Sequence, residues 1–378
     1  MNSKLFSLLA AFAITSGVAT AQTSVTTGGV KKVLIEEGTG AWCGYCVDGA
    51  LDVDLIRAAN PNAIAVSIHN GDGMTTPEGN TYVSAYITGF PKGTVDRALV
   101  NGQTAVGLGR NLWASAATER SALTPQVDVT MTHSYNASTK TITINVTAKT
   151  LVALTGDYNL NAYVVEDSVS GTGANYDQHN YYSHEESSPA GGTSHPYYNQ
   201  PGVIVGFKHM QVVRKMLGGT YGTTGVITTN SATNKTYTKT YTYVIPTTQN
   251  ASRLKLVGMV MKNNTSDPND RQILNSVQAK FMPFALGVSQ LPVLDEVSIY
   301  PNPATSTISV SGQWTRTADV KLTLTNTLGQ TVYTKNMKGT SGANFQEAIE
   351  VSHLSAGLYI LHLQSEGTEV MQKVSVAH

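Results

Sequence analysis

Apolar positions recur with two different spacings along residues 29–122, and the two spacings alternate. A short apolar run at 33–35 is followed by apolar residues at helical spacing over 47–58, which Asn60-Pro61 brings to an end. A second apolar run follows at 64–68. Short apolar runs separated by helical segments are typical of a sheet with helices packed on it. The pattern therefore predicts an α/β domain over residues 29–122.

Long runs of strand type replace this pattern after Thr124-Pro125. They lie at 127–135, 140–150, 160–167, 235–245 and 254–261. Residues 141–146 alternate strictly between polar and apolar, as a half-buried antiparallel strand does. Residues 123–287 are therefore predicted to form a β-sandwich, with a Tyr- and His-rich insertion near 171–202 that lacks apolar periodicity.

The last part of the chain is again rich in strand signals. Pro292 lies in a predicted linker at 288–296. Beyond the linker, Val320, Leu322 and Leu324 alternate with polar residues. Residues 297–378 are therefore predicted to form a small all-β, Ig-like C-terminal domain.

The N-terminus has the pattern of a secretory signal peptide. Lys4 precedes an apolar run at 5–14, and Ala19-Thr20-Ala21 provides small residues at a cleavage site. Residues 1–21 are therefore predicted to be removed on export. No later segment approaches the roughly 20 apolar residues that a membrane-spanning helix needs, so we expect no integral membrane anchor.

The charge of the chain favours no polyanionic partner. Charged residues make up 13% of the chain, and the formal net charge is +0. A protein that binds nucleic acid usually carries a basic surface, which this composition does not supply. We therefore expect no nucleic-acid partner.

The residues with the clearest chemistry are Cys43 and Cys46, the only two cysteines of the chain. They stand between the first predicted strand and the first predicted helix. A cysteine at a helix N-terminus lies beside unpaired N–H groups and the positive end of the helix dipole, which stabilise a thiolate. In thiol–disulfide exchange, Cys43 would attack a substrate disulfide and Cys46 would resolve the mixed disulfide. The alternative is a structural disulfide, since cysteine pairs oxidise and stay oxidised in an oxidising envelope.

This segment resembles the thioredoxin superfamily. The resemblance rests on Val33-Leu34-Ile35-Glu36-Glu37, Trp42-Cys43-Gly44-Tyr45-Cys46 and Gly89-Phe90-Pro91. It implies a thioredoxin-like fold in which Glu37 is buried beneath the cysteines and relays the proton of the resolving thiol. It also implies a cis peptide bond before Pro91, which leaves the backbone of Phe90 free to pair with a substrate strand. The candidate catalytic residues are therefore Cys43, Cys46, Glu37 and Pro91.

Two further groups of residues have side chains of the type that binds metals. They are His179, His184, Glu185, His195 and His209 in and after the insertion, and Asp267, Asn269 and Asp270 in a later loop. The spacings in the first group match no metal-binding pattern. The second group lacks the glycine and terminal glutamate of a hand-like calcium loop. We therefore expect no metal site, and no other cofactor is indicated.

Two larger resemblances involve the rest of the chain. The segment that begins at Lys32 and the segment Phe207-Lys208-His209-Met210-Gln211-Val212-Val213-Arg214-Lys215-Met216-Leu217 resemble the family related to outer membrane protein 28. Members of that family pair a thioredoxin-like fold with a β-sandwich. Tyr300-Pro301-Asn302-Pro303, Thr327-Leu328-Gly329-Gln330 and Leu354-Ser355-Ala356-Gly357-Leu358-Tyr359 resemble, in this order, a type A sorting domain of the type IX secretion system. This second resemblance implies that the type IX machinery reads residues 297–378 and carries the protein to the outer-membrane surface or the extracellular space.

Two functions remain open at this point. The first is a cell-surface or secreted thiol–disulfide oxidoreductase that acts on a protein disulfide or thiol through Cys43 and Cys46. The second is a non-enzymatic surface binding or adhesion protein in which the disulfide is structural. Exposed tyrosines in the insertion suit the second function, because tyrosine buries a large area at a small cost in conformational entropy.

Overall fold

β-strands dominate the described part of the chain. The computed structural model describes residues 23–100, 102–136, 138–281, 291, 293–366 and 368–377, and over these it has 22 strands and three α-helices. The described residues fall into two compact units, within 22–283 and within 284–378. The predicted signal peptide at 1–21 lies outside the described residues, as do 288–290 and 292 of the predicted linker. The domain boundaries given above stay predictions.

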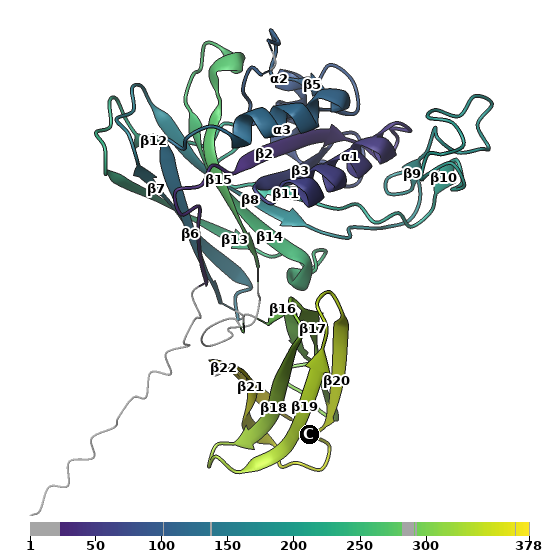
Figure 1. Cartoon of the computed structure of the whole chain (residues 1–378), viewed down its shortest axis with the longest axis vertical. Helices are drawn as coiled ribbons and strands as arrows, with labels where there is room; N and C mark the ends of the chain where they lie inside the picture. The colour runs from purple at the N-terminus through teal and green to yellow at the C-terminus, as the bar shows by residue number, and fades with distance from the viewer. Residues whose placement is uncertain are drawn as a thin grey trace, which may run out of the picture. The chain divides into compact units, whose positions relative to one another are not determined.

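Nine strands of the first unit form a single sheet (Figure 1). Its order is β15-β14-β8-β11-β3-β2-β4-β5, and β12 pairs with β8 off this path. The strands are β2 (Val33–Thr39), β3 (Ala63–His69), β4 (Lys92–Val95), β5 (Leu108–Gly109), β8 (Tyr158–Glu166), β11 (Val212–Met216), β12 (Thr223–Ile227), β14 (Leu254–Lys262) and β15 (Ile273–Lys280). β11 joins the two halves of the sheet, because it runs parallel to β3 and antiparallel to β8.

The prediction of an α/β thioredoxin-like N-terminal domain is wrong. The structure is mostly β, and β2 to β5 belong to the same sheet as β8, β14 and β15 of the predicted sandwich. An apolar run in the sequence identifies a strand. It does not show which other strand will pair with the edge of that strand. The free edge of β3 would leave backbone N–H and C=O groups unpaired, and β11 meets this edge with Val212 opposite Ser67.

Helices cover both faces of one half of the nine-stranded sheet. α1 (Cys46–Ala59) and α3 (Trp113–Ser121) bury apolar side chains against Val33 and Ile35, whereas α2 (Pro77–Tyr86) packs on the face that carries Leu34. Successive side chains of a strand point to opposite faces, so α2 lies across the sheet from the other two helices. None of the helices in the described ranges is long and apolar enough to span a membrane.

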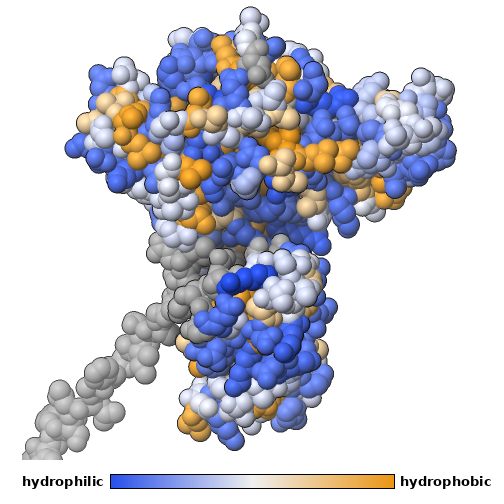
Figure 2. All heavy atoms as spheres, in the orientation of Figure 1, coloured by the Kyte–Doolittle hydropathy of each residue, from blue (hydrophilic) through white to orange (hydrophobic). Residues whose placement is uncertain are grey.

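A four-stranded sheet covers the other half of the nine-stranded sheet. Its order is β1-β6-β7-β13, with β1 (Thr23–Thr26), β6 (Val127–Asn136), β7 (Thr141–Thr150) and β13 (Thr236–Val244). β6 and β7 bury every second residue along most of their length, and the apolar side chains among these share one core with those of β8 and β14. On the face drawn in Figure 2, hydrophobic residues of this unit form small groups separated by hydrophilic ones.

A buried ion pair ties the helical half of the nine-stranded sheet to the other half. Arg97 donates from Nε and Nη2 to the two carboxylate oxygens of Glu36, both at 2.7 Å, and Tyr163 of β8 donates to the same carboxylate at 3.0 Å. Arg97 and Glu36 are fully buried. Removing one partner of a buried pair leaves an uncompensated charge, which costs about 3–5 kcal/mol. This network therefore holds β2 and β8 in one rigid layer.

The second unit is all β and has its own core. Its two sheets have the orders β16-β17-β20 and β19-β18-β21-β22. The strands are β16 (Leu294–Tyr300), β17 (Thr307–Trp314), β18 (Ala318–Asn326), β19 (Thr331–Gly339), β20 (Asn344–Glu350), β21 (Gly357–Ser365) and β22 (Thr368–Val376). Trp314, Leu322 and Leu361 are buried in a single apolar cluster that draws on both sheets. β16 begins inside the predicted linker.

Candidate functional site

The two cysteines form a disulfide in the turn between β2 and α1. Their Cα atoms are 5.4 Å apart. The turn is held by hydrogen bonds from the Cys43 N–H to the Gly40 carbonyl and from the Cys46 N–H to the Cys43 carbonyl, both of 3.0 Å. Cys43 is 4% exposed and Cys46 1%, whereas Trp42 and Tyr45 beside them are 41% and 45% exposed. Two exposed aromatic side chains therefore flank a nearly buried disulfide.

Glu37 lies beneath the first turn of α1. Its carboxyl accepts a hydrogen bond from Ser67 at 3.1 Å through Oε2, while Oε1 is buried and has no hydrogen-bond partner among the described residues. A Cβ atom on Gly49 would lie 2.5 Å from this Oε1, so only glycine lets the helix approach the carboxyl so closely. Burial raises the pKa of Glu37 to about 8. The carboxyl can therefore hold a proton at neutral pH.

Pro91 lies on the other side of the same glycine. A Cβ atom on Gly49 would lie 2.9 Å from the Cβ of Pro91, and the Phe90–Pro91 peptide bond is cis. The ring of Phe90 meets the ring of Trp42 edge to face, with centroids 5.1 Å apart. The structure thus places all four predicted site residues around the start of α1, with Glu37 and Pro91 brought together at Gly49.

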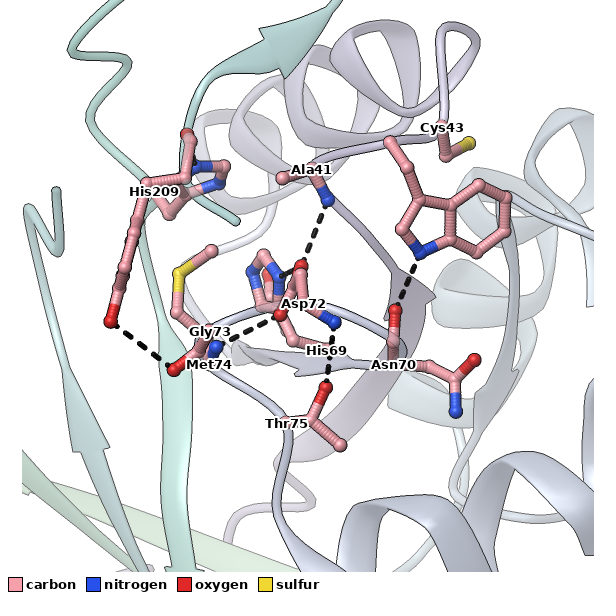
Figure 3. Close-up of polar contacts among 12 residues, drawn as sticks. Ala41, Cys43, His69, Asn70, Asp72, Gly73, Met74, Thr75 and His209 are labelled. Carbon is pink, nitrogen blue, oxygen red and sulfur yellow. Dashed lines mark hydrogen bonds and ion pairs between the residues drawn. The ribbon is translucent and has the colours of Figure 1, made fainter. Parts of the chain in front are cut away.

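Asp72 holds the approach to the cysteine turn, and sequence reasoning missed it (Figure 3). Its carboxylate accepts the N–H groups of Ala41 and Met74, each at 2.9 Å, and the Nδ1–H of His69 at 2.6 Å. Burial by itself would raise the pKa of this carboxyl, but the hydrogen bond and charge of His69 and the backbone N–H groups hold the pKa below its usual value. The signal available in the sequence was the short Asn70-Gly71-Asp72-Gly73 turn directly after an apolar run.

His209 packs against this Asp72 loop. Its ring meets that of His69 edge to face, with centroids 5.0 Å apart, and its Nε2 donates to the carbonyl of Tyr176 at 2.8 Å. Burial, together with the nearby His69, lowers the pKa of His209 to about 4. His209 is therefore neutral at physiological pH and belongs to the packing around the loop.

The Tyr-rich insertion docks on the cysteine turn. The insertion contains β9 (Gln178–His179). This strand pairs with β10 (Val203–Ile204), which directly follows the insertion. His179 and Tyr181 donate their N–H groups to the carbonyls of Ala41 and Gly44, at 2.8 and 3.0 Å. The side chain of Gln178 donates to the carbonyl of Cys43 at 2.9 Å. Figure 1 shows β9 and β10 beside α1, so this segment covers the turn and is no free loop.

A polar cluster fastens the insertion to the first turn of α1. Asp48 pairs with Arg110 and with Nε2 of His195, the latter at 3.0 Å. Arg110 also donates to the hydroxyl of Tyr182 at 2.9 Å, and the ring of Tyr182 stacks on that of His195 with centroids 3.8 Å apart. Over the described ranges, no three His, Cys, Asp or Glu side chains are grouped so that they could hold a metal ion.

The arrangement provides two of the groups that thiol–disulfide exchange uses. Cys43 and Cys46 form a disulfide at the start of α1, and Glu37 is a buried acid beneath the first turn of the same helix. The insertion occupies the carbonyls of Ala41, Cys43 and Gly44 in the turn, so these groups are not free to pair with a partner.

Comparisons with known proteins identify both units. A family described as "Secretion system C-terminal sorting domain" matches residues 298–377, and one described as "Outer membrane protein Omp28" matches residues 79–283. The second match begins after the cysteine motif. No curated protein matches the chain.

Similar solved structures are distant. HBP35 of Porphyromonas gingivalis is 16% identical, with a TM-score of 0.49, 92% of this chain covered and 98% of that one. A calcium-binding mutant of Bacteroides uniformis β-glucuronidase 2 is 11% identical, with a TM-score of 0.18, 63% of this chain covered and 26% of that one. A Salmonella α-2-macroglobulin mutant is 8% identical, with a TM-score of 0.20 and coverages of 67% and 17%. With TM-scores this low, none of them carries an argument about this chain.

The family matches settle the destination of the protein. Its C-terminal sorting domain is recognised by the type IX secretion machinery, and the protein is exported to the cell surface or the extracellular space. Because the Omp28 match spans more than half of the 378 residues, the chain belongs to the outer membrane protein Omp28 family.

Proposed function

We propose that this exported protein carries out thiol–disulfide exchange through Cys43 and Cys46. The observation that supports this most is the buried carboxyl of Glu37, whose Oε1 has no hydrogen-bond partner among the described residues. Burying a polar group without a partner costs about 1–3 kcal/mol, and a structural disulfide gains nothing from that cost. A proton carrier does gain from it, because burial brings the pKa of the carboxyl to about 8, where it can both hold and release a proton close to neutral pH.

The disulfide seen in the structure is the oxidising form of the pair. A substrate thiolate would attack the Sγ of Cys43, which breaks the Cys43–Cys46 bond and forms a mixed disulfide with Cys43. Cys46 would leave as a thiolate and take the proton of Glu37. A second substrate thiolate would then displace Cys43, so that the substrate gains a disulfide and the protein gains two electrons. The reverse sequence reduces a substrate disulfide, with Glu37 accepting the proton of Cys46.

A second candidate is a surface binding protein with a structural disulfide. Both sulfurs are buried, and the insertion is hydrogen-bonded to the turn that carries them. These observations favour the second candidate, because exchange needs an accessible sulfur. In this case Cys43 and Cys46 only hold the turn that the insertion docks on.

Measurements of redox potential and exchange rate separate the two. The mature chain is equilibrated with glutathione to obtain the reduction potential, and its reaction with a dithiol peptide is followed with time. Exchange predicts a potential well above the range of structural disulfides, which lie below about −300 mV. It also predicts that Cys43→Ser abolishes the single exchange with the dithiol peptide and that Glu37→Gln slows it roughly a hundredfold. Glu119→Gln, an exposed carboxyl of the same unit, is the matched control and should react normally. A potential below the structural limit, with no reaction with the dithiol peptide, would refute exchange and leave the binding protein.

A further inference from the structure

A pocket opens away from the cysteines, where the end of α3 meets the starts of β6 and β15. Its volume is about 130 Å³, which is room for several water-sized groups. Its lining residues are Lys31, Arg120, Leu123, Thr124, Gln126, Gln272 and Leu274. Two of these are cations and three carry neutral polar groups, so the lining is rich in hydrogen-bond donors.

The two cations share one carboxylate oxygen. Nζ of Lys31 lies 2.5 Å from Oδ2 of Asp96, and Nε of Arg120 lies 3.1 Å from the same oxygen. The other carboxylate oxygen accepts the N–H of Leu34. The side chains of Lys31, Arg120 and Asp96 are only 2%, 9% and 0% exposed. Two buried positive charges therefore face a single negative one.

The C-terminal end of α3 does not cancel this excess of positive charge. A helix C-terminus contributes about half a negative charge, which leaves about half a positive charge in the cluster. Burial lowers the pKa of Lys31, although Asp96 opposes this change. An additional anion would relieve the desolvation of both cations.

Arg120 also has donors to spare. It uses Nε for Asp96, but neither Nη1 nor Nη2 has an acceptor among the described residues, although the side chain is more than nine-tenths buried. The side chains of Gln126, which is exposed, and Gln272, which is partly buried, likewise have no partners there. The Nη atoms of Arg120 are not among the buried unpartnered side-chain atoms of the described residues, so they are open to the pocket and available to a ligand. A planar guanidinium matches the two oxygens of a carboxylate.

We propose that this pocket binds a small carboxylate with a short apolar tail. The terminal nitrogens of Arg120 would hold the two carboxylate oxygens, with Lys31 supplying the second positive charge. The tail would lie against Leu123 and Leu274. These apolar walls favour an organic acid over an inorganic oxyanion, which has no apolar part to bury.

Calorimetric titration of the mature chain tests this, with propionate as the probe and propionamide as its uncharged counterpart. Propionate should bind and raise the thermal midpoint, whereas propionamide should do neither. Arg120→Lys keeps the charge but loses the planar fork, and it should weaken binding roughly tenfold or more. Arg57→Lys, a partly exposed position on α1 outside the pocket, is the matched control and should bind as the parent does.

Gln272→Leu leaves all three buried charges in place and serves as the second variant if Arg120→Lys fails to fold. It should weaken propionate binding by roughly threefold or more, because one polar partner is lost. The proposal is overturned if propionate does not bind, if propionamide binds equally well, or if the folded pocket variants bind like the control. Tighter binding of sulfate or phosphate than of propionate would also overturn it, since it would mark a general oxyanion site.

Discussion

Replacing Glu37 with glutamine should remove a large part of the pH dependence of stability. The pKa of this carboxyl is about 8 in the folded protein against 4.5 for the unperturbed group. Because the folded pKa is raised, the stabilisation is complete below the unfolded pKa and is lost as the pH rises through the folded one. Each unit of difference corresponds to about 1.4 kcal/mol, so the total loss is about 5 kcal/mol. That is a large share of the stability of a typical domain, which is about 5–15 kcal/mol.

Urea unfolding at several pH values, with the disulfide intact, measures this loss. Between about pH 5 and about pH 9 the parent should lose about 4 kcal/mol more than Glu37→Gln, since the glutamine carries no proton equilibrium. Glu119→Gln should follow the parent. Parallel curves for the parent and Glu37→Gln would refute the argument, because they would mean that the carboxyl is ionised and solvated in the folded protein.

Three further predictions concern other parts of the first unit. Gly44→Ala should loosen the insertion and expose it to proteases, because the new Cβ would lie 2.3 Å from the ring of Tyr181. Gly89→Ala, whose new Cβ would have nothing within 4 Å, is the control, and equal digestion of the two variants would contradict the prediction. The pKa of His133, lowered by burial to about 4 from 6.5, means that stability falls by about 3 kcal/mol as the pH drops through this range, and acid unfolding of His133→Leu should lack that fall. Asp72→Asn should lower the free energy of urea unfolding by about 1–3 kcal/mol, since the amide cannot accept all three of the donors that the carboxylate satisfies. An unchanged unfolding midpoint would count against the stabilising role of these three hydrogen bonds.

The site could be predicted from the sequence further than the fold could. Local strand and helix signals were enough to place Cys43 and Cys46 between a strand and a helix. Glu37 and Pro91 were placed through the resemblance of their motifs. These predictions did not depend on how the strands are ordered in the sheet.

The fold depended on pairings that no local pattern records. β8 is buried at every position, so its sequence lacks the alternation that would show which face meets which layer. β11 is only five residues long, yet it joins β3 to β8 across a long stretch of chain. The docking of the insertion was missed for a related reason. Part of it uses backbone N–H groups, which are the same in any sequence, and the rest uses side-chain pairs such as Asp48 and His195 that lie far apart in the sequence.

The uneven exposure of the three tryptophans has an optical consequence. Trp113 and Trp314 are 0% and 2% exposed, whereas Trp42, next to Cys43, is 41% exposed. A soluble quencher should therefore extinguish the emission of Trp42 and leave the other two nearly unaffected. The quenchable part of the fluorescence then comes from a single indole beside the disulfide. Opening and closing of the Cys43–Cys46 bond can be followed in real time on the unlabelled protein.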